Sequence, residues 1–293
     1  MISFFADIFG YVLNALYQLV NNYGFAIILF SIILKLIMLP ISIKQQKTMK
    51  KSSKIQEKLK VIQDKYKNNP EKMNQETIEL YKNEKMSPFS GCLSSIAQIV
   101  ILFAVFYLVR SPLTYMKKVE PDLINRYTTE IQQQENNKNT AYPEISIIKE
   151  KGSTDERVHI NMDFLGLDLS SVPSQDLSDW RVYVIPGLYV LTSVISMRMT
   201  TSMQQTTKKE EENGEPNEMD AVAQANKSMS LLMPIMSVSI AIIAPLGLAL
   251  YWLINNILMI VERIALNKFL KEELPPLQQR TSKCIFPSLN TYG

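Results

Sequence analysis

Lys35 has the most unusual setting of any ionisable residue in this chain. It lies inside an apolar run, YGFAIILFSIILKLIMLPISI, that extends from Tyr23 to Ile43 without another charge. A run of this length spans a bilayer, and an ammonium group near its middle costs roughly 2.5 to 3.5 kcal/mol on insertion scales. Such a charge persists in a membrane helix mainly where it faces water, a partner or cargo. Lys35 is therefore a candidate binding residue, and the chemistry open to it is the attraction of anionic groups.

Polar side chains also recur within the other apolar runs. Ser31 precedes Lys35 by one helical turn and shares its face. Ser, Thr and Asn in membrane helices ordinarily bond across helices or to their own backbone, and this explanation suffices for any single one of them. The other polar candidates are Gln98, Thr192, Ser196, Tyr251, Trp252 and Asn255.

Lys35 is not explained so easily, because the sequence offers few counter-charges. No acidic residue lies inside the other apolar runs, and Glu262 falls at the end of the last one. This inventory nearly excludes a buried salt bridge. We therefore expect a water-filled cavity around the ammonium group.

Five apolar runs, each of spanning length or nearly so, must position these side chains. The chain has 293 residues, of which 46% are hydrophobic and 20% charged, and the two kinds are segregated along it. The last two runs are joined by a tight turn at residues 244–247. The pattern predicts an all-α membrane protein with five transmembrane helices, at residues 23–43, 88–110, 181–200, 227–244 and 245–264.

The distribution of Lys and Arg predicts how the helices are oriented. Residues 43–87 hold twelve Lys against six acidic residues, whereas residues 111–180 hold seven Lys and Arg against twelve. Basic loops stay in the cytoplasm, so we expect residues 44–87 and 265–293 inside and the loop 111–180 outside. Residues 201–226 are more acidic than basic, but acidic residues contribute little to orientation, so we expect them inside as well. With five spans, the N-terminus is then external and the C-terminus cytoplasmic.

Residues 1–22 need a separate interpretation. They contain no Lys or Arg, unlike the start of a secretory signal, and Asp7, Tyr11, Asn14 and Gln18 recur at helical spacing. This pattern indicates an amphipathic helix on the outer membrane interface. A sixth span or an uncleaved signal is the alternative.

The basic segment 44–87 predicts a helical hairpin. One helix is expected from about 44 to 67 and a second from about 71 to 86, because Asn68-Asn69-Pro70 interrupts the pattern between them. Lysines on such a hairpin could contact anionic lipid, ribosomal RNA or an acidic partner. Equally, they could form a solvated face that only reinforces topology.

Enzyme signatures are missing from the sequence. Cys92 and Cys284 both fall on the predicted cytoplasmic side, so no disulfide is expected, and His159 is the single histidine. The sequence has no Walker lysine loop, GxSxG or HExxH motif. We expect no cofactor, no metal and no catalytic activity.

Four segments carry a family resemblance through their order and spacing. They are LKLIMLPISIKQQKTM at 34–49, SPFSGCLSSIAQI at 87–99, FLGLDLS at 164–170 and LMPIMSVSIAIIAPLGLALYWLINNILMI at 232–260. Together they resemble the YidC-type membrane protein insertases of bacterial, mitochondrial and thylakoid membranes. The family usually has Arg where Lys35 stands, and Lys lacks the bidentate fork of Arg. The matching positions are Lys35, Pro40, Pro88, Gly91, Cys92, Gln98, Pro234, Pro245, Gly247, Tyr251 and Trp252.

This resemblance implies a non-enzymatic insertase in the bacterial cytoplasmic membrane. Its five spans would surround a polar groove that is open to the cytoplasm and to lipid and closed on the outside. The implied partners are nascent membrane proteins and membrane lipids, with the ribosome and the Sec translocon reached through the basic hairpin and tail. The implied groove residues are Lys35, Ser31, Gln98, Thr192, Ser196, Tyr251, Trp252 and Asn255.

Other classes of protein stay open from the residues alone. A small-solute or ion transporter can use an intramembrane lysine, but such proteins usually show repeated halves and coupling carboxylates. A structural assembly factor would need the same surface without a groove. An intramembrane hydrolase is the least favoured class, since the spans contain no pair of nucleophile and base.

Overall fold

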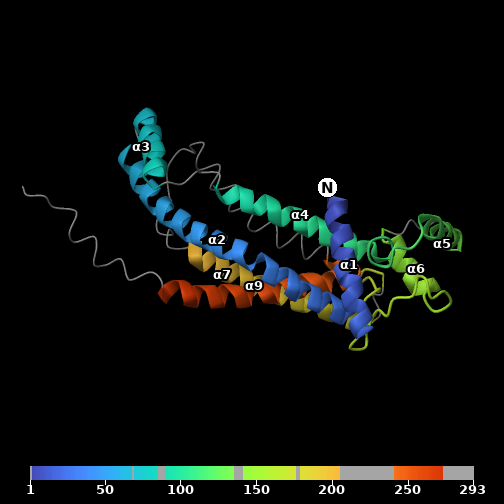
Figure 1. The fold of residues 1–293 in the computed structure, drawn as a ribbon. Coiled ribbons are helices and arrows are strands. Elements are labelled where there is room, and N and C mark those ends of the chain that lie inside the picture. Colours follow the sequence, from blue (N-terminus) through green and yellow to red (C-terminus); the bar gives the residue numbers. More distant parts are fainter. Residues whose placement is uncertain are drawn as a thin grey trace, which may run out of the picture.

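The computed structural model describes residues 2–67, 69–84, 90–134, 141–175, 179–204 and 241–272. Most of these residues are helical, in agreement with the predicted all-α class (Figure 1). The longer helices are α1 (Ile2–Val20), α2 (Tyr23–Lys65), α3 (Pro70–Asn83), α4 (Ser90–Arg110), α7 (Val184–Gln204) and α9 (Leu246–Glu272). A smaller unit, here called the cap, contains the π-helix η1 (Leu113–Lys117), α5 (Pro121–Gln134), α6 (Pro143–Lys151), β1 (Asp163–Phe164), β2 (Leu167–Asp168) and the 3-10 helix η2 (Trp180–Tyr183).

Helix α2 is longer than the sequence predicted. It continues for 43 residues, so the expected span and the expected first helix of the hairpin form one element. Asn22 caps its first turn by accepting a hydrogen bond from the Phe25 N–H at 3.2 Å. Pro40 lies inside the helix without ending it, a placement that membrane helices tolerate.

Helices α2, α7 and α9 all begin at the cap and run away from it (Figure 1). Backbone bonds fix two of these starting points: the Tyr23 N–H donates to the Asn161 carbonyl at 3.0 Å, and the Gly247 N–H donates to the Leu169 carbonyl at 2.9 Å. These bonds satisfy N–H groups that a helix N-terminus leaves free. Helices α7 and α9 therefore run in the same direction (Figure 1). The span predicted at 227–244, between them in the sequence, lies outside the described residues apart from 241–244.

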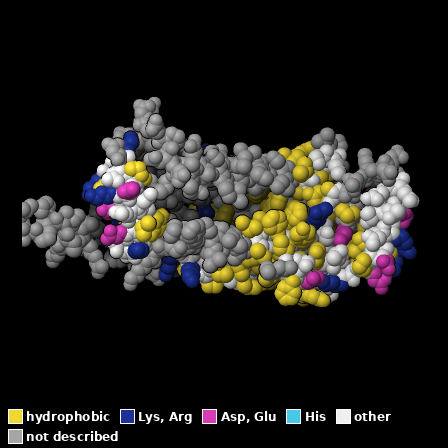
Figure 2. Space-filling model, turned by 90° about the horizontal axis from the view of Figure 1, so that it is seen from above, with side chains coloured by type: hydrophobic (Ala, Val, Ile, Leu, Met, Phe, Trp, Pro, Cys, Tyr) yellow, Lys and Arg dark blue, Asp and Glu magenta, His cyan; other side chains and the backbone are white. Residues whose placement is uncertain are grey.

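Four described helices are long and apolar enough to cross a membrane, namely Ile2–Val20, Tyr23–Thr48, Trp180–Met199 and Leu246–Lys268. The last three contain or nearly contain the spans predicted at 23–43, 181–200 and 245–264. The apolar segment Gln98–Arg110 of α4 is shorter. Figure 2 shows mainly hydrophobic side chains along the middle of the molecule and charged ones toward its two ends, a distribution that suits a protein crossing a bilayer.

Helix α1 differs from the other apolar helices in direction. Figure 1 shows it crossing the cap end of the bundle at a steep angle to α2 and α9. Gly10 permits close packing against η1, since a Cβ atom there would lie 2.0 Å from the Tyr115 carbonyl oxygen. The Lys118 ammonium pairs with Asp7 and lies 4.9 Å from the centre of the Tyr11 ring. The polar stripe of α1 is therefore partly occupied by the cap, and its interfacial position in the membrane stays a prediction.

Helix α3 packs antiparallel against the distal third of α2. Asn69 caps α3 by accepting from the Lys72 N–H at 3.1 Å, and Pro70 occupies its first turn. Lys58 pairs with Glu84 at 2.5 Å near the base of this two-helix arm, and Tyr66 donates to Glu76 at 3.2 Å near its tip. The interruption at Asn68-Asn69-Pro70 thus lies between two helices.

The cap is organised around a buried carboxylate. Glu144 of α6 accepts hydrogen bonds from the N–H of Leu113 at 2.7 Å, from the N–H of Thr114 at 3.0 Å and from the Thr114 hydroxyl at 2.6 Å. Burial raises the pKa of Glu144 above its ordinary value, and the hydrogen bonds from Thr114 and Leu113 oppose this effect. The stability that its protonation contributes is complete below the ordinary pKa and is lost as the pH rises through the raised one. Glu144 therefore holds the start of η1 at the point where α4 enters the cap.

Replacing Glu144 by Ala should open this part of the cap, because two backbone N–H groups lose their acceptor. The expected cost is about 2 to 4 kcal/mol of local stability, which corresponds to roughly 30- to 1000-fold faster amide exchange at residues 113–117. Hydrogen–deuterium exchange with mass spectrometry measures this. Glu144→Gln is the matched control, since its carbonyl oxygen still accepts both N–H groups. Equal exchange in the Ala variant and the wild type would show that Glu144 does not hold η1.

Candidate functional site

The Lys35 ammonium forms an ion pair with Glu262 between α2 and α9. Its Nζ atom lies 2.6 Å from Glu262 Oε2, and the two side chains are 19% and 8% exposed. The prediction that nearly excluded a buried salt bridge for Lys35 is therefore wrong. Breaking such a pair by removing one partner typically costs about 3 to 5 kcal/mol.

The prediction failed because Glu262 was judged by its position at the end of its own apolar run and not by its height beside α2. At a rise of 1.5 Å per residue, Lys35 lies about 18 Å along α2 from Tyr23, and Glu262 lies about 24 Å along α9 from Leu246. The two helices run in the same direction, and long flexible side chains can cover the remaining offset. Glu262 therefore lies level with a residue near the middle of a span, although it lies close to the end of the predicted span 245–264.

The ion pair leaves hydrogen-bonding capacity unused. Glu262 Oε1 is buried and has no hydrogen-bond partner among the described residues. A carboxylate accepts through both oxygens, and an ammonium group has three donors. A buried acceptor without a donor is costly, so this site would gain from a group that donates to Glu262.

Two of the predicted polar residues bond to their own helix. The Ser31 hydroxyl is buried and donates to the Ile27 carbonyl at 2.7 Å. The Thr192 hydroxyl is shared between the Leu188 and Tyr189 carbonyls, both at 3.0 Å. These contacts match the ordinary role of hydroxyls in membrane helices.

The remaining predicted residues of α7 and α9 are buried or half-buried. The Trp252 ring lies 5.9 Å from the Tyr189 ring, Tyr251 belongs to the buried core, and Ser196 is buried. Asn255 is half-buried, on the same helix as Glu262.

Gln98 lies apart from these contacts and is exposed on α4. Of the predicted residues, Trp252 contacts α7 through the Tyr189 ring, and Gln98 is not brought into that contact. The spans predicted at 88–110 and 227–244 would supply other walls of a groove, and much of them lies outside the described side chains.

One polar contact was not singled out as part of the site from the sequence. Asn256 donates to the Ser193 hydroxyl at 2.7 Å, which links α9 to α7 across their contact. Asn256 directly follows Asn255, so the Asn-Asn pair inside an apolar run was the available signal. This bond fixes the rotation of α9 against α7, one turn and a half before Glu262.

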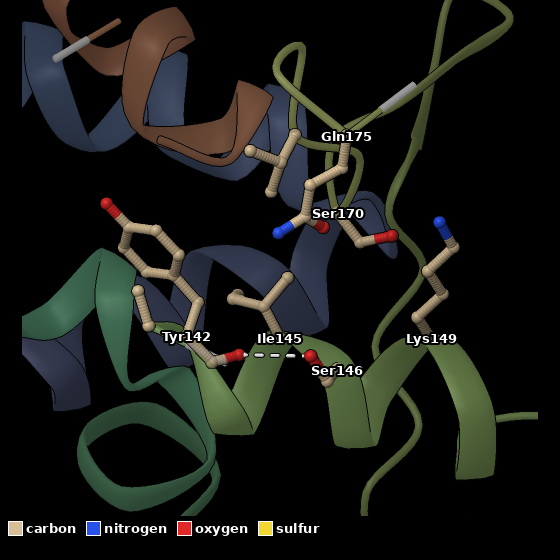
Figure 3. A pocket seen from close by; sticks show the side chains of 8 residues that line it. Tyr142, Ile145, Ser146, Lys149, Ser170 and Gln175 are labelled. Carbon is tan, nitrogen blue, oxygen red and sulfur yellow. Dashed lines mark hydrogen bonds between the residues drawn. The ribbon is translucent and has the colours of Figure 1, made fainter. Parts of the chain in front are cut away.

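A separate small cavity lies in the cap, between α6 and the segment 170–175 (Figure 3). Its volume of about 40 Å³ has room for a few water molecules and is too small for a peptide. Figure 3 shows the Ser146 hydroxyl bonded to the Tyr142 carbonyl, while the Gln175 amide points into the cavity. This cavity is far too small to hold a helix of cargo.

Residues 15–273 match the family model described as 60Kd inner membrane protein. The chain belongs to this family. The match includes the last six residues of α1, all of α2, α4, α7 and α9, and both members of the ion pair. The four described helices of spanning length fit a multi-pass member of an inner membrane protein family.

Similar proteins carry the name membrane protein insertase YidC. The relative from Syntrophobacter fumaroxidans is 27% identical over 266 residues, which is 91% of this chain and 38% of the relative. The relative from Caldanaerobacter subterraneus is 26% identical over 254 residues, or 87% of this chain and 89% of the relative. A shorter alignment with the Fusobacterium nucleatum protein is 38% identical over 120 residues, or 39% of this chain and 58% of the relative. The chain thus spans little more than a third of the Syntrophobacter relative and most of the Caldanaerobacter one.

Proposed function

We propose that this protein inserts newly made membrane proteins into the bacterial cytoplasmic membrane. Family membership and the insertase name of its relatives support this function. The observation that carries the mechanism is the Lys35–Glu262 pair between two spanning helices. Here a donor and an acceptor would meet an incoming polar segment that has lost most of its water.

The energetic problem of insertion is the polar part of the cargo. Each unpaired backbone or side-chain polar group costs several kcal/mol in hydrocarbon. An acidic residue near the end of the cargo could replace Glu262 at the Lys35 ammonium. This would exchange one ion pair for another, so its net cost is much smaller than that of separating a pair.

Glu262 would then receive donors from the cargo. Its Oε1 atom is buried and has no partner among the described residues, so backbone N–H or hydroxyl groups could bind there. A polar groove lined by Ser31, Thr192, Ser196 and Asn255 would extend these contacts. Cargo would leave between α7 and α9 into lipid.

The basic arm formed by α2 and α3 would face the cytoplasm. Its lysines would attract the ribosome, the Sec translocon or anionic lipid, with the tail 265–293 on the same side. The external side would then carry the cap and α1. In this orientation the N-terminus is outside and the C-terminus inside.

A crosslinking experiment tests the groove and the exit route together. Single Cys probes at Thr192 and Asn255, in a variant whose two native Cys residues are replaced by Ser, should crosslink to a nascent single-spanning protein. A Cys probe at Ile8, which is exposed on α1, is the control and should crosslink on the order of tenfold less. Equal yields at all three positions would contradict a defined path along α7 and α9.

Glu262 also bears on the transporter alternative. A carboxylate paired with Lys35 inside the helices is a group that a coupled transporter could use. Uptake of a labelled solute or ion into proteoliposomes, lost on Glu262→Gln, would favour this alternative. Insertion of cargo by the same proteoliposomes without such uptake would favour the insertase.

A further inference from the structure

The turn between β1 and β2 contains an unusual residue for its conformation. Leu165 and Gly166 both have positive φ, at 53° and 78°. Two-residue hairpin turns of this kind prefer Asn-Gly or Gly-Gly, because a bulky side chain is strained in the left-handed region. Leu165 is also 78% exposed, so neither the turn geometry nor the packing of the cap explains a large apolar residue here.

The hairpin is held firmly against the first turn of α2. Asn22 Nδ2 donates to the Asp163 carbonyl at 2.5 Å, and the Phe164 ring lies 5.2 Å from the Phe25 ring. Phe164 also covers Gly24, where a Cβ atom would lie 2.3 Å from that ring. The exposed tip therefore has a fixed height along the bundle.

That height coincides with the start of two candidate membrane spans. One begins at Tyr23, directly before the residues that hold β1, and the other begins at Trp180, in the 3-10 helix η2 that packs beside β2. Trp180 is 74% exposed, and Asp179 fixes this turn by accepting from the Arg181 N–H at 3.0 Å. Tryptophan is enriched where a membrane helix meets the headgroup region.

The neighbouring corner between α1 and α2 exposes another apolar side chain. Asn161 Nδ2 donates to the Asn21 carbonyl at 2.9 Å, which places this corner beside the hairpin. Leu19, two residues before Asn21, is 80% exposed. Apolar groups from three separate segments are thus exposed around one end of the spans.

We infer that Leu165 and Trp180, together with Leu19, form an anchor that enters the lipid interface at the cap end of the protein. The partner is the bilayer surface itself, because the anchor continues the apolar surface of the two spans at the level where they begin. The strained Leu165 is then retained for its contact with lipid. The rigid link to α2 would fix the depth of the cap and the tilt of α2 against the membrane.

Spin labels on the full chain in phospholipid vesicles test this inference. In a variant with both native Cys residues replaced by Ser, labels would be placed at Leu165→Cys, Ser153→Cys and Leu36→Cys. Ser153 is exposed on the cap and serves as the water control, and Leu36 is exposed within the span and serves as the lipid control. The measured quantity is the ratio of accessibility to oxygen, which concentrates in lipid, over accessibility to a water-soluble nickel complex.

The label at Leu165 should give a ratio at least fivefold above that at Ser153 and below that at Leu36. A ratio equal to that at Ser153 would overturn the anchor. Loss of accessibility to both reagents that disappears on dilution with lipid would assign this surface to a second copy of the chain, and would also overturn it. The variant Leu165→Asn separates backbone strain from lipid contact. Because Asn tolerates the left-handed conformation, thermal stability in detergent should be preserved or raised. Because Asn does not enter lipid, the Trp180 side chain should come into closer contact with water in vesicles.

Discussion

Replacing both Lys35 and Glu262 by Met is expected to leave the protein folded while lowering the insertion of cargo with an acidic tail at least tenfold. The structural reason is that apolar residues of similar volume often substitute for a buried ion pair without loss of stability, whereas they offer an incoming carboxylate no partner. At about 4 Å and an effective dielectric of 20, a cargo carboxylate would lose roughly 4 kcal/mol of attraction before desolvation is considered. Thermal unfolding in detergent and insertion into proteoliposomes measure the two effects separately.

Single substitutions at the pair give a graded series of controls. Lys35→Arg keeps the charge and should preserve insertion. Lys35→Glu places a carboxylate against Glu262, whose Oε2 lies 2.6 Å from the native ammonium, and should abolish insertion of acidic cargo. Normal insertion by the double Met variant would assign the pair a purely structural role and remove it from the mechanism.

The spans predicted at 23–43, 181–200 and 245–264 could be read from the sequence because their signal is local. The apolar run that begins at Tyr23 forms a helix wherever it lies, since a bilayer requires internally satisfied backbone groups. The signal that separates α2 from α3 before Pro70 is local as well, because proline restricts the residue that precedes it. These features need no knowledge of which helices are neighbours.

The Lys35–Glu262 pair could not be found in this way because it depends on the relative height of two helices that are far apart in sequence. An inventory of charges within the spans missed Glu262, whose position in its own helix seemed too close to the cytoplasm. The arrangement of the cap could not be predicted for a different reason. It depends on single contacts, such as the hydrogen bonds from η1 to the Glu144 carboxylate, and such contacts leave no periodic pattern in the sequence. The role of the groove residues, Lys35 included, stays a prediction.

Deleting residues 50–86, which form most of the basic arm, is expected to lower insertion on the order of tenfold while the spans stay folded. The deletion is feasible because Lys51 Nζ donates to the Glu84 carbonyl at 2.5 Å, so the two helices of the arm are close at its base. A short Gly-Ser linker can therefore join the chain ends that the deletion leaves. Helix α3 packs mainly against α2 among the described elements, whereas the lysines of the arm would raise the local concentration of acidic partners. Reconstituted insertion and thermal unfolding measure the two consequences.

A series of charge variants on the intact arm separates the attraction of acidic partners by its lysines from the effect of the shape of the arm. Lys67, Lys72 and Lys82 are exposed, so Gln at these three positions removes charge without disturbing the Lys58–Glu84 pair. The Gln variant should insert less cargo, with a weaker dependence on salt, and the matched Arg variant should insert normally. Labelling of single Cys residues from either side of the membrane checks that orientation is unchanged, since fewer lysines could also weaken the positive-inside signal. Full insertion by the Gln variant with unchanged orientation would reduce the arm to a solvated surface, because recruitment by charge requires that charge to be present.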